Sequence, residues 1–100
     1  MIKNGSRLQS QVCDTQVIVV RSADGLDDLR AGGAPMIPIG DDADAALSLD
    51  DSLAGGNLMG KRYVDDGGAE VLVTKAGKGT LSIGTTPLSI KEAKPLPASD

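Results

Sequence analysis

The sequence contains no histidine, tryptophan or phenylalanine, and it has one tyrosine (Tyr63) and one cysteine (Cys13). Without histidine, the chain cannot build Ser-His or Cys-His nucleophilic catalysis, imidazole acid-base chemistry or an imidazole metal site. A single cysteine also excludes an intramolecular disulfide and a cysteine-based zinc finger. Much of the usual catalytic repertoire is missing, so elimination favours a binding function over an enzymatic one.

Positive charge is also scarce, because ten Lys and Arg residues face 14 Asp and Glu residues, for a net charge of −4. This balance disfavours binding to nucleic acid or to an anionic membrane surface. The longest aliphatic run, Val17–Val20, is far shorter than the roughly 20 residues that span a bilayer. No apolar stretch follows Lys3 as in a secretory signal, and a lone thiol suits a reducing compartment. We therefore expect a cytoplasmic protein without a nucleic-acid or membrane partner.

What the sequence does contain is an internal similarity within one expected domain, residues 1–100. Residues 5–38 and 60–90 agree in order and spacing at eight identical positions. These are Gly5/Gly60, Arg7/Arg62, Val17/Val71, Val19/Val73, Gly25/Gly79, Leu29/Leu81, Gly32/Gly84 and Pro35/Pro87. We interpret the similarity as a duplication. The alternative is two unrelated hairpins built from the same β-forming residues.

Each repeat is rich in residues that favour strands. The β-branched run Val17–Val20 and the alternating segment Ala69–Lys75 both predict strands. Gly25 and Gly79 are expected to take a positive φ in tight turns, so that each repeat folds back as a hairpin. A second turn is expected at Gly32-Gly33 and at the matching Gly84.

Proline constrains the position of the next segment in each repeat. Because proline cannot donate to a strand ladder, Pro35 and Pro87 are expected at a strand start or a sheet edge. A further strand is expected in each repeat, over 7–12 in the first repeat and over 62–64 in the second.

Three or four strands per repeat cannot cover their own apolar face in water. We therefore predict an all-β fold in which the two repeats close against each other as a small pseudo-twofold β-barrel, or as a compact sandwich. This architecture is similar to the double-psi and swapped-hairpin barrels as a group. That group includes enzymes, adaptors and DNA-binding regulators, so the architecture settles no activity.

The linker, residues 40–59, contains five Asp and no basic residue. It is compatible either with a short helix over 43–54 capped by Asp42 or with an irregular crossover. The acidic run lacks the EF-hand spacing, so we interpret it as a solvated loop rather than a calcium site. We predict no metal and no cofactor. The proline-spaced tail, residues 91–100, is expected to be extended.

The strongest candidate ligand-binding residues are the matched arginines Arg7 and Arg62, followed by the matched pair Arg21 and Lys75. Equivalent guanidinium groups related by a pseudo-twofold axis could converge on one anion, since each binds a carboxylate or phosphate with two hydrogen bonds. The alternative is that each arginine pairs locally with Asp or Glu. Cys13 is a further candidate if Arg7 or Arg21 lowers its pKa; otherwise it is a small buried hydrophobic residue.

These observations predict a non-enzymatic β-barrel that binds a protein partner or a small anionic ligand, as an accessory or adaptor subunit. A homo-oligomer is expected because a 100-residue core without large side chains buries limited apolar area. The alternative is a small lyase or isomerase in which Arg7 and Arg62 hold an anionic substrate. Its acid or base would be Cys13, Asp14, Tyr63 or Glu70. A DNA-binding regulator is a third alternative, and it requires a basic face on this acidic protein.

Overall fold

The computed structural model describes residues 2–91, and its regular elements are ten β-strands and two 3-10 helices. The predicted all-β class is confirmed. The strands are β1 (Arg7–Gln9), β2 (Gln16–Arg21), β3 (Leu29–Ala31), β4 (Ala34–Pro35), β5 (Ile37–Pro38), β6 (Arg62–Val64), β7 (Glu70–Lys75), β8 (Leu81–Ile83), β9 (Thr86–Pro87) and β10 (Ser89–Ile90). The 3-10 helices are η1 (Asp24–Asp28) and η2 (Asp51–Leu53).

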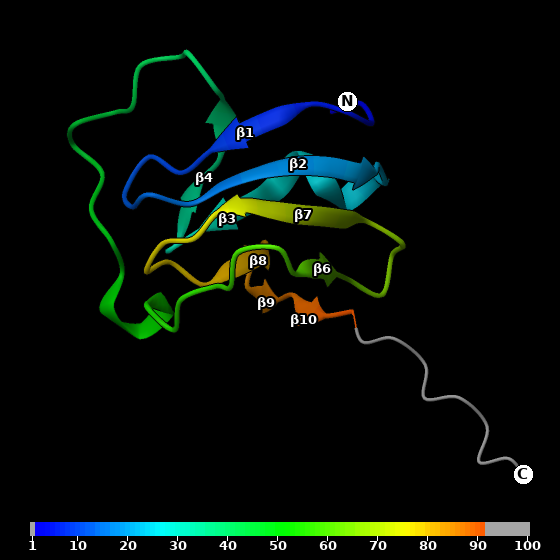
Figure 1. The fold of residues 1–100 in the computed structure, drawn as a ribbon. Helices are drawn as coiled ribbons and strands as arrows, with labels where there is room; N and C mark the ends of the chain where they lie inside the picture. The colour runs from blue at the N-terminus through cyan, green and yellow to red at the C-terminus, as the bar shows by residue number, and fades with distance from the viewer. Residues whose placement is uncertain (1, 92–100) are drawn as a thin grey trace, which may run out of the picture.

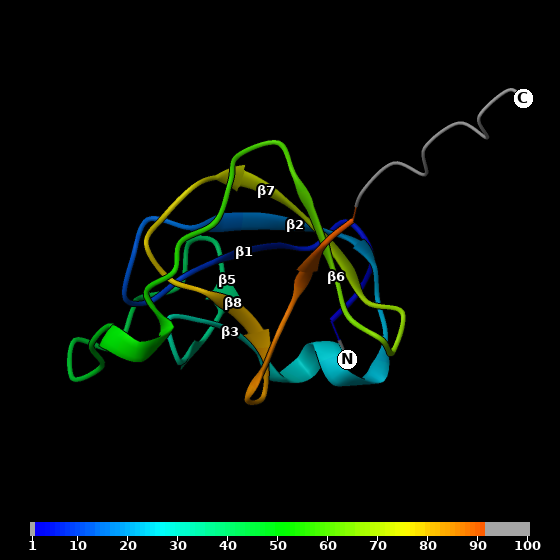
Figure 2. The same ribbon diagram turned by 90° about the horizontal axis from the view of Figure 1, so that it is seen from below.

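The strands form two antiparallel sheets. The six-stranded sheet has the order β10-β6-β7-β2-β1-β5, and the four-stranded sheet has the order β4-β3-β8-β9. Figure 1 shows β1, β2, β7 and β6 in front of β3 and β8, and Figure 2 shows the two layers edge-on. The core lies between the layers, where Val17 and Val71 from the six-stranded sheet are fully buried with Leu26 of η1 and Leu29 of β3.

The predicted barrel is not found, because the strands of residues 2–91 form two separate sheets rather than one closed ladder. The chain passes from the four-stranded to the six-stranded sheet through a single residue, Met36 between β4 and β5 and Leu88 between β9 and β10. Three of the four edge strands, β4, β5 and β9, contain a proline, Pro35, Pro38 and Pro87. Proline has no N–H to donate to a closing strand. The expectation that Pro35 and Pro87 lie at sheet edges is confirmed.

The predicted turns at Gly25 and Gly79 are wrong. Neither glycine has a positive φ, and the strands that flank each of them lie in different sheets, so no hairpin forms there. Gly25 instead lies in η1, which carries the chain from β2 to β3. The hairpin between β3 and β4 turns at Gly32 and Gly33, whose φ values are 64° and 89°. Two consecutive positive φ values match the right-handed twist of the paired strands.

Both halves of the chain supply the same strands to each sheet. When β1–β5 are exchanged with β6–β10 in order, each of the two strand orders becomes the same list read from the opposite end. The two halves meet where β2 pairs with β7 and β3 pairs with β8. Backbone hydrogen bonds recur at matched positions: Gly5 N to Val19 O (2.7 Å) and Gly60 N to Val73 O (2.8 Å), Met36 N to Leu29 O (2.9 Å) and Leu88 N to Leu81 O (2.9 Å).

The segment between β5 and β6 is an irregular crossover, and the helix considered over 43–54 is reduced to the single turn of η2. Asp50 caps that turn by accepting a hydrogen bond from Ser52 N at 3.0 Å. A carboxylate is favourable at this end of a helix because it faces unpaired N–H groups. The crossover extends beyond the ends of the sheets in Figure 1. No helix within residues 2–91 is long and apolar enough to cross a membrane. The predicted tail lies outside the described residues except for Lys91.

Candidate functional site

Four candidate cations lie on the outer face of the six-stranded sheet. Strand register places Arg7 of β1 opposite Ile18, Ile18 opposite Leu72, and Leu72 opposite Arg62 of β6. Directly opposed residues project from the same face of a sheet. Because Val17 and Val19 point into the core, this row lies on the outer face. Its two half-buried aliphatic side chains have an exposed arginine on either side.

The second matched pair lies on the same face. Arg21 is opposite Glu70, and Lys75 is opposite Gln16. The register between β2 and β7 shifts next to each of these two pairs. Each shift is a β-bulge, one with an extra residue on β2 and the other with an extra residue on β7, and a bulge increases the local twist of the strand. We refer to Arg7, Arg21, Arg62 and Lys75, with Ile18 and Leu72 between them, as the cationic face.

One carboxylate, Glu70, lies on this face, and its side chain is only 10% exposed. It accepts a hydrogen bond from Lys91 Nζ at 3.0 Å and pairs with Arg62 Nη1 at 3.4 Å. The hydrogen bond from Lys91, together with the positive charges of Lys91 and Arg62, holds the pKa of Glu70 below its usual value despite some desolvation. The matched position on β2 is the uncharged Gln16. Within residues 2–91, Arg7, Arg21 and Lys75 form no ion pair.

The spacing of the two arginines limits what they can bind together. Arg7 and Arg62 are separated by three strand intervals, which is about 14 Å at roughly 4.8 Å per interval. Arg62 is also directed along the sheet to Glu70. This arrangement suits an extended anionic group better than one carboxylate shared by both guanidinium groups.

Arg7 also borders a hollow of about 420 Å³ beside the edge of the sheet. Lys3 and Ser6 contribute polar groups to it, and Ile2, Leu8 and Pro38 contribute apolar surface. The hollow therefore combines two cations with an apolar wall.

Cys13 lies in the loop between β1 and β2 and is partly buried. Its Sγ is 3.2 Å from the hydroxyl oxygens of both Ser10 and Thr15. Burial raises the pKa of the thiol, but hydrogen bonds from these hydroxyls and from the backbone of Thr15 and Gly79 outweigh it and lower the pKa below its ordinary value. No arginine contributes to this shift, so the thiolate is stabilised by neutral donors of the loops.

A buried asparagine, Asn57, connects this loop to the second half of the chain. Its Nδ2 donates to Thr15 Oγ1 at 2.7 Å and to Gly79 O at 2.9 Å, and its Oδ1 accepts from Gly77 N at 3.1 Å. Asn57 is not among the candidates from the sequence, because an isolated asparagine after two glycines is also typical of an ordinary turn.

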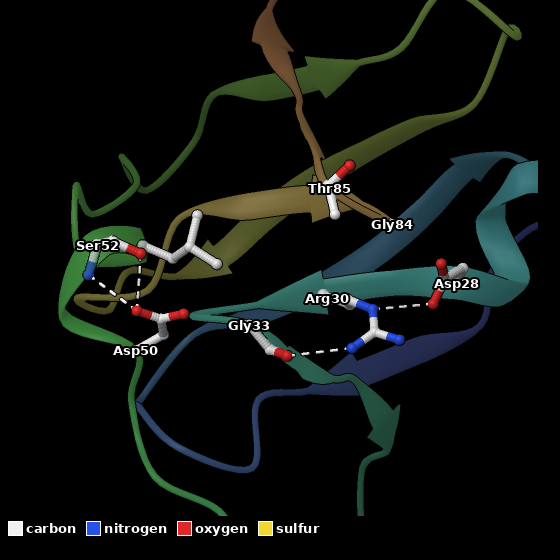
Figure 3. Close-up of a pocket in the computed structure, with 8 residues that line it drawn as sticks. Asp28, Arg30, Gly33, Asp50, Ser52, Gly84 and Thr85 are labelled. Carbon is white, nitrogen blue, oxygen red and sulfur yellow. Dashed lines mark hydrogen bonds and ion pairs between the residues drawn. The ribbon is translucent and has the colours of Figure 1, made fainter.

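A pocket of about 410 Å³ lies beside the four-stranded sheet, where the crossover meets the two hairpin turns (Figure 3). Arg30 donates from Nε to Asp28 at 2.9 Å and from Nη1 to Gly33 O at 3.2 Å. On the other side Asp50 accepts from Ser52 N and Oγ, which lowers the pKa of Asp50. Arg30 is not among the candidates from the sequence, because the matched position in the second repeat is Ser82 rather than a basic residue. Since each charged group already has a partner, the pocket is a structural junction.

The acid-base candidates of the enzymatic alternative are spread over the molecule. Tyr63 points into the core and its hydroxyl oxygen accepts from Leu58 N at 3.0 Å. Among Cys13, Asp14, Tyr63 and Glu70, Glu70 alone contacts a candidate arginine within residues 2–91. Over the same residues, no three His, Cys, Asp or Glu side chains are grouped as metal ligands would be.

No protein family model matches this chain, and neither a curated protein nor a solved structure is significantly similar to it. The function is therefore argued from the site alone.

Proposed function

We propose that this protein is a non-enzymatic binding module, an accessory or adaptor subunit, that recognises an anionic protein segment on the cationic face. The observation that carries the proposal is the row Arg7–Ile18–Leu72–Arg62, with Arg21 and Lys75 on the same side. Apolar groups at the centre and charged groups at the rim are the usual composition of a protein interface. The complementary charges steer the encounter and select the partner.

The location of the charges supports this assignment. No Asp lies in any strand of the described chain, and Glu70 is the one acidic residue in a strand. Between residues 2 and 91, the Asp residues instead lie in the loops and 3-10 turns. A protein of net charge −4 thus presents a local cationic surface, surrounded by loops that would repel the long polyanionic backbone of a nucleic acid.

We also propose that the chain arose by duplication and that a pseudo-twofold axis passes between β2 and β7 and between β3 and β8. The palindromic strand orders and the recurring backbone hydrogen bonds support this proposal. A duplication also accounts for the cationic face. The pseudo-twofold axis would relate Arg7 to Arg62 and Arg21 to Lys75, so that each basic residue of one half has a counterpart in the other half. We retain the proposals that the protein is cytoplasmic and self-associates.

A small anionic ligand is a second candidate, supported by the hollow lined by Lys3, Ser6 and Arg7. The lyase or isomerase alternative has less support, because Glu70, the one acid-base candidate beside an arginine, is held by two cations and is a weak base.

The test is binding of fluorescein-labelled oligoglutamate, followed by fluorescence anisotropy at low salt. We expect the variant Arg7→Gln/Arg21→Gln/Lys75→Gln to lose at least tenfold in affinity, since three exposed ion pairs contribute roughly 0.5 kcal/mol each. Lys78→Gln is the matched control for Lys75→Gln, because Lys78 lies three residues further on, in the loop after β7. Equal losses from the two lysine variants, or no binding by the unaltered protein, would contradict the proposal.

A further inference from the structure

We infer that the cationic face binds the acidic crossover of a second copy of this chain, so that the protein associates head to tail. This inference rests on the proposed function, since it identifies the anionic segment that the cationic face recognises. The bound segment is residues 41–51 of the second copy.

The two surfaces have complementary patterns. The cationic face places exposed Arg7, Arg21 and Lys75 around a partly apolar centre, where Val20 is 38% exposed beside Ile18 and Leu72. The crossover places Leu47, also 38% exposed, between acidic residues on both sides in the sequence. Those residues are Asp41, Asp42, Asp44, Asp50 and Asp51. The crossover thus has an apolar side chain between carboxylates, which complements the apolar strip between cations on the cationic face.

The crossover is not used inside its own molecule in this way. No ion pair joins a crossover aspartate to a lysine or arginine within residues 2–91. The one ion-paired Asp in that range is Asp28 of η1, which pairs with Arg30. Asp44 and Asp50 accept local hydrogen bonds from Ala46 N and Ser52, whereas the carboxylates of Asp41, Asp42 and Asp51 have no partner within residues 2–91 and are available to another molecule.

The anchoring of the crossover prevents it from folding back onto its own cationic face. At its start, Gln9 Nε2 donates to Asp41 O at 2.8 Å, and Gln11 Oε1 accepts from Asp44 N at 2.9 Å. At its end, Asp50 N donates to Gly32 O at 3.0 Å, which attaches it to the four-stranded sheet. Figure 1 shows the resulting loop beyond the ends of the strands rather than over the face of the six-stranded sheet.

Because the two surfaces differ, each copy offers one donor surface and one acceptor surface. Such a heterologous contact forms a ring if the rotation between copies closes, and a chain if it does not. Exposed ion pairs are individually weak and are screened by salt. The association is therefore expected at high protein concentration and low ionic strength.

The first experiment is sedimentation velocity on the unaltered protein in ~0.01 M salt and in ~1 M salt, where the screening length falls from about 30 Å to about 3 Å. We expect a mass above the 10.2 kDa of one chain at low salt and a return to the single-chain mass at high salt. A single-chain mass at both salt concentrations would overturn the inference.

The second experiment separates the two surfaces. The face variant Arg7→Gln/Arg21→Gln/Lys75→Gln keeps its crossover, and the crossover variant Asp41→Asn/Asp42→Asn/Asp51→Asn keeps its face. No side-chain hydrogen bond of these three aspartates is lost, because within residues 2–91 none makes one. We expect each variant alone to be a single chain, and an equimolar mixture to form a heterodimer and nothing larger.

The control for the crossover variant is Asp14→Asn/Asp24→Asn/Asp66→Asn, which changes the charge equally in two other loops and at the start of η1, and it is expected to associate like the unaltered protein. Association by the crossover variant alone, or no heterodimer in the mixture, would overturn the inference. Oligoglutamate distinguishes the two failures. If the probe binds the face while the protein stays a single chain, the inference fails and the proposed function stands; if the probe does not bind, the proposed function fails as well.

Discussion

At the scale of single residues, Glu70 determines how much positive charge the cationic face presents. Its carboxylate binds Arg62 and Lys91, whereas the matched position on β2 is the uncharged Gln16. The two halves of one face thus differ in charge. Arg62 is partly neutralised by Glu70, while Arg7 has no ion-pair partner within residues 2–91.

Replacing Glu70 by Gln tests this role through the dependence of stability on pH. The folded state lowers the pKa of Glu70, so its contribution to stability is present above the unfolded pKa of about 4.3 and is lost as the pH falls through the folded pKa. We expect Glu70→Gln to lower the melting temperature at pH 7 and to match the unaltered protein at low pH. Asp66→Asn, which removes an exposed carboxylate that makes no hydrogen bond in the described chain, is the control. A difference that is constant with pH would exclude this role.

At the scale of elements, the two halves are joined by close backbone packing at Gly79, in the loop that leads from β7 to β8. A Cβ atom there would lie 2.7 Å from Gly32 N and 3.0 Å from the carbonyl carbon of Ala31. Since Gly79 has no positive φ, glycine is required for space rather than for backbone conformation. The same loop donates to Cys13 and accepts from Asn57.

Gly79→Ala is therefore expected to destabilise the fold by about 2 kcal/mol or more, because backbone atoms cannot move aside as a flexible side chain can. Urea unfolding measures the effect. The matched control is Gly67→Ala, where the nearest atom is a side-chain oxygen of Asp65 at 3.3 Å rather than a backbone atom, and φ is not positive. Similar losses at both positions would show that glycine matters for another reason.

At the scale of the whole molecule, the two halves share both sheets and one core. β2 pairs with β7, and β3 with β8. Val17 and Val19 of the first half pack with Val71 and Val73 of the second. The covalent connection through the crossover is therefore less important for stability than the pairing between the halves.

The two halves are therefore expected to stay together when the chain is cut in the crossover. A protease site inserted after Ala45, in an exposed part of the crossover, should be cleaved without loss of the β-sheet circular dichroism spectrum. The two fragments should co-elute in gel filtration and separate in urea, with the uncut insertion variant as the control. Separation of the fragments in native buffer would show that the crossover itself holds the halves together.

Much of the fold follows from local sequence. The β-branched run Val17–Val20 and the alternating segment Ala69–Lys75 correctly predict the two central strands. The missing N–H of Pro35 and Pro87 correctly predicts edge positions. The consecutive glycines Gly32 and Gly33 correctly predict a turn. In each case the cause is a property of the residue itself, either side-chain branching, a missing donor or access to positive φ.

The tertiary structure decided which strands pair and whether a turn forms a hairpin or carries the chain to the other sheet. The sequence near Gly25 and Gly79 is equally compatible with a hairpin and with a passage between sheets, and only the burial of both sheets' inner faces selects the passage. Arg7, Arg21, Arg62 and Lys75 are candidates by composition and matched spacing. Their presence on one face depends on the pairing of β2 with β7, a contact between distant segments that no local pattern encodes. Asn57 became significant for the same reason, since its partners Thr15, Gly77 and Gly79 adjoin it only after the two halves have come together.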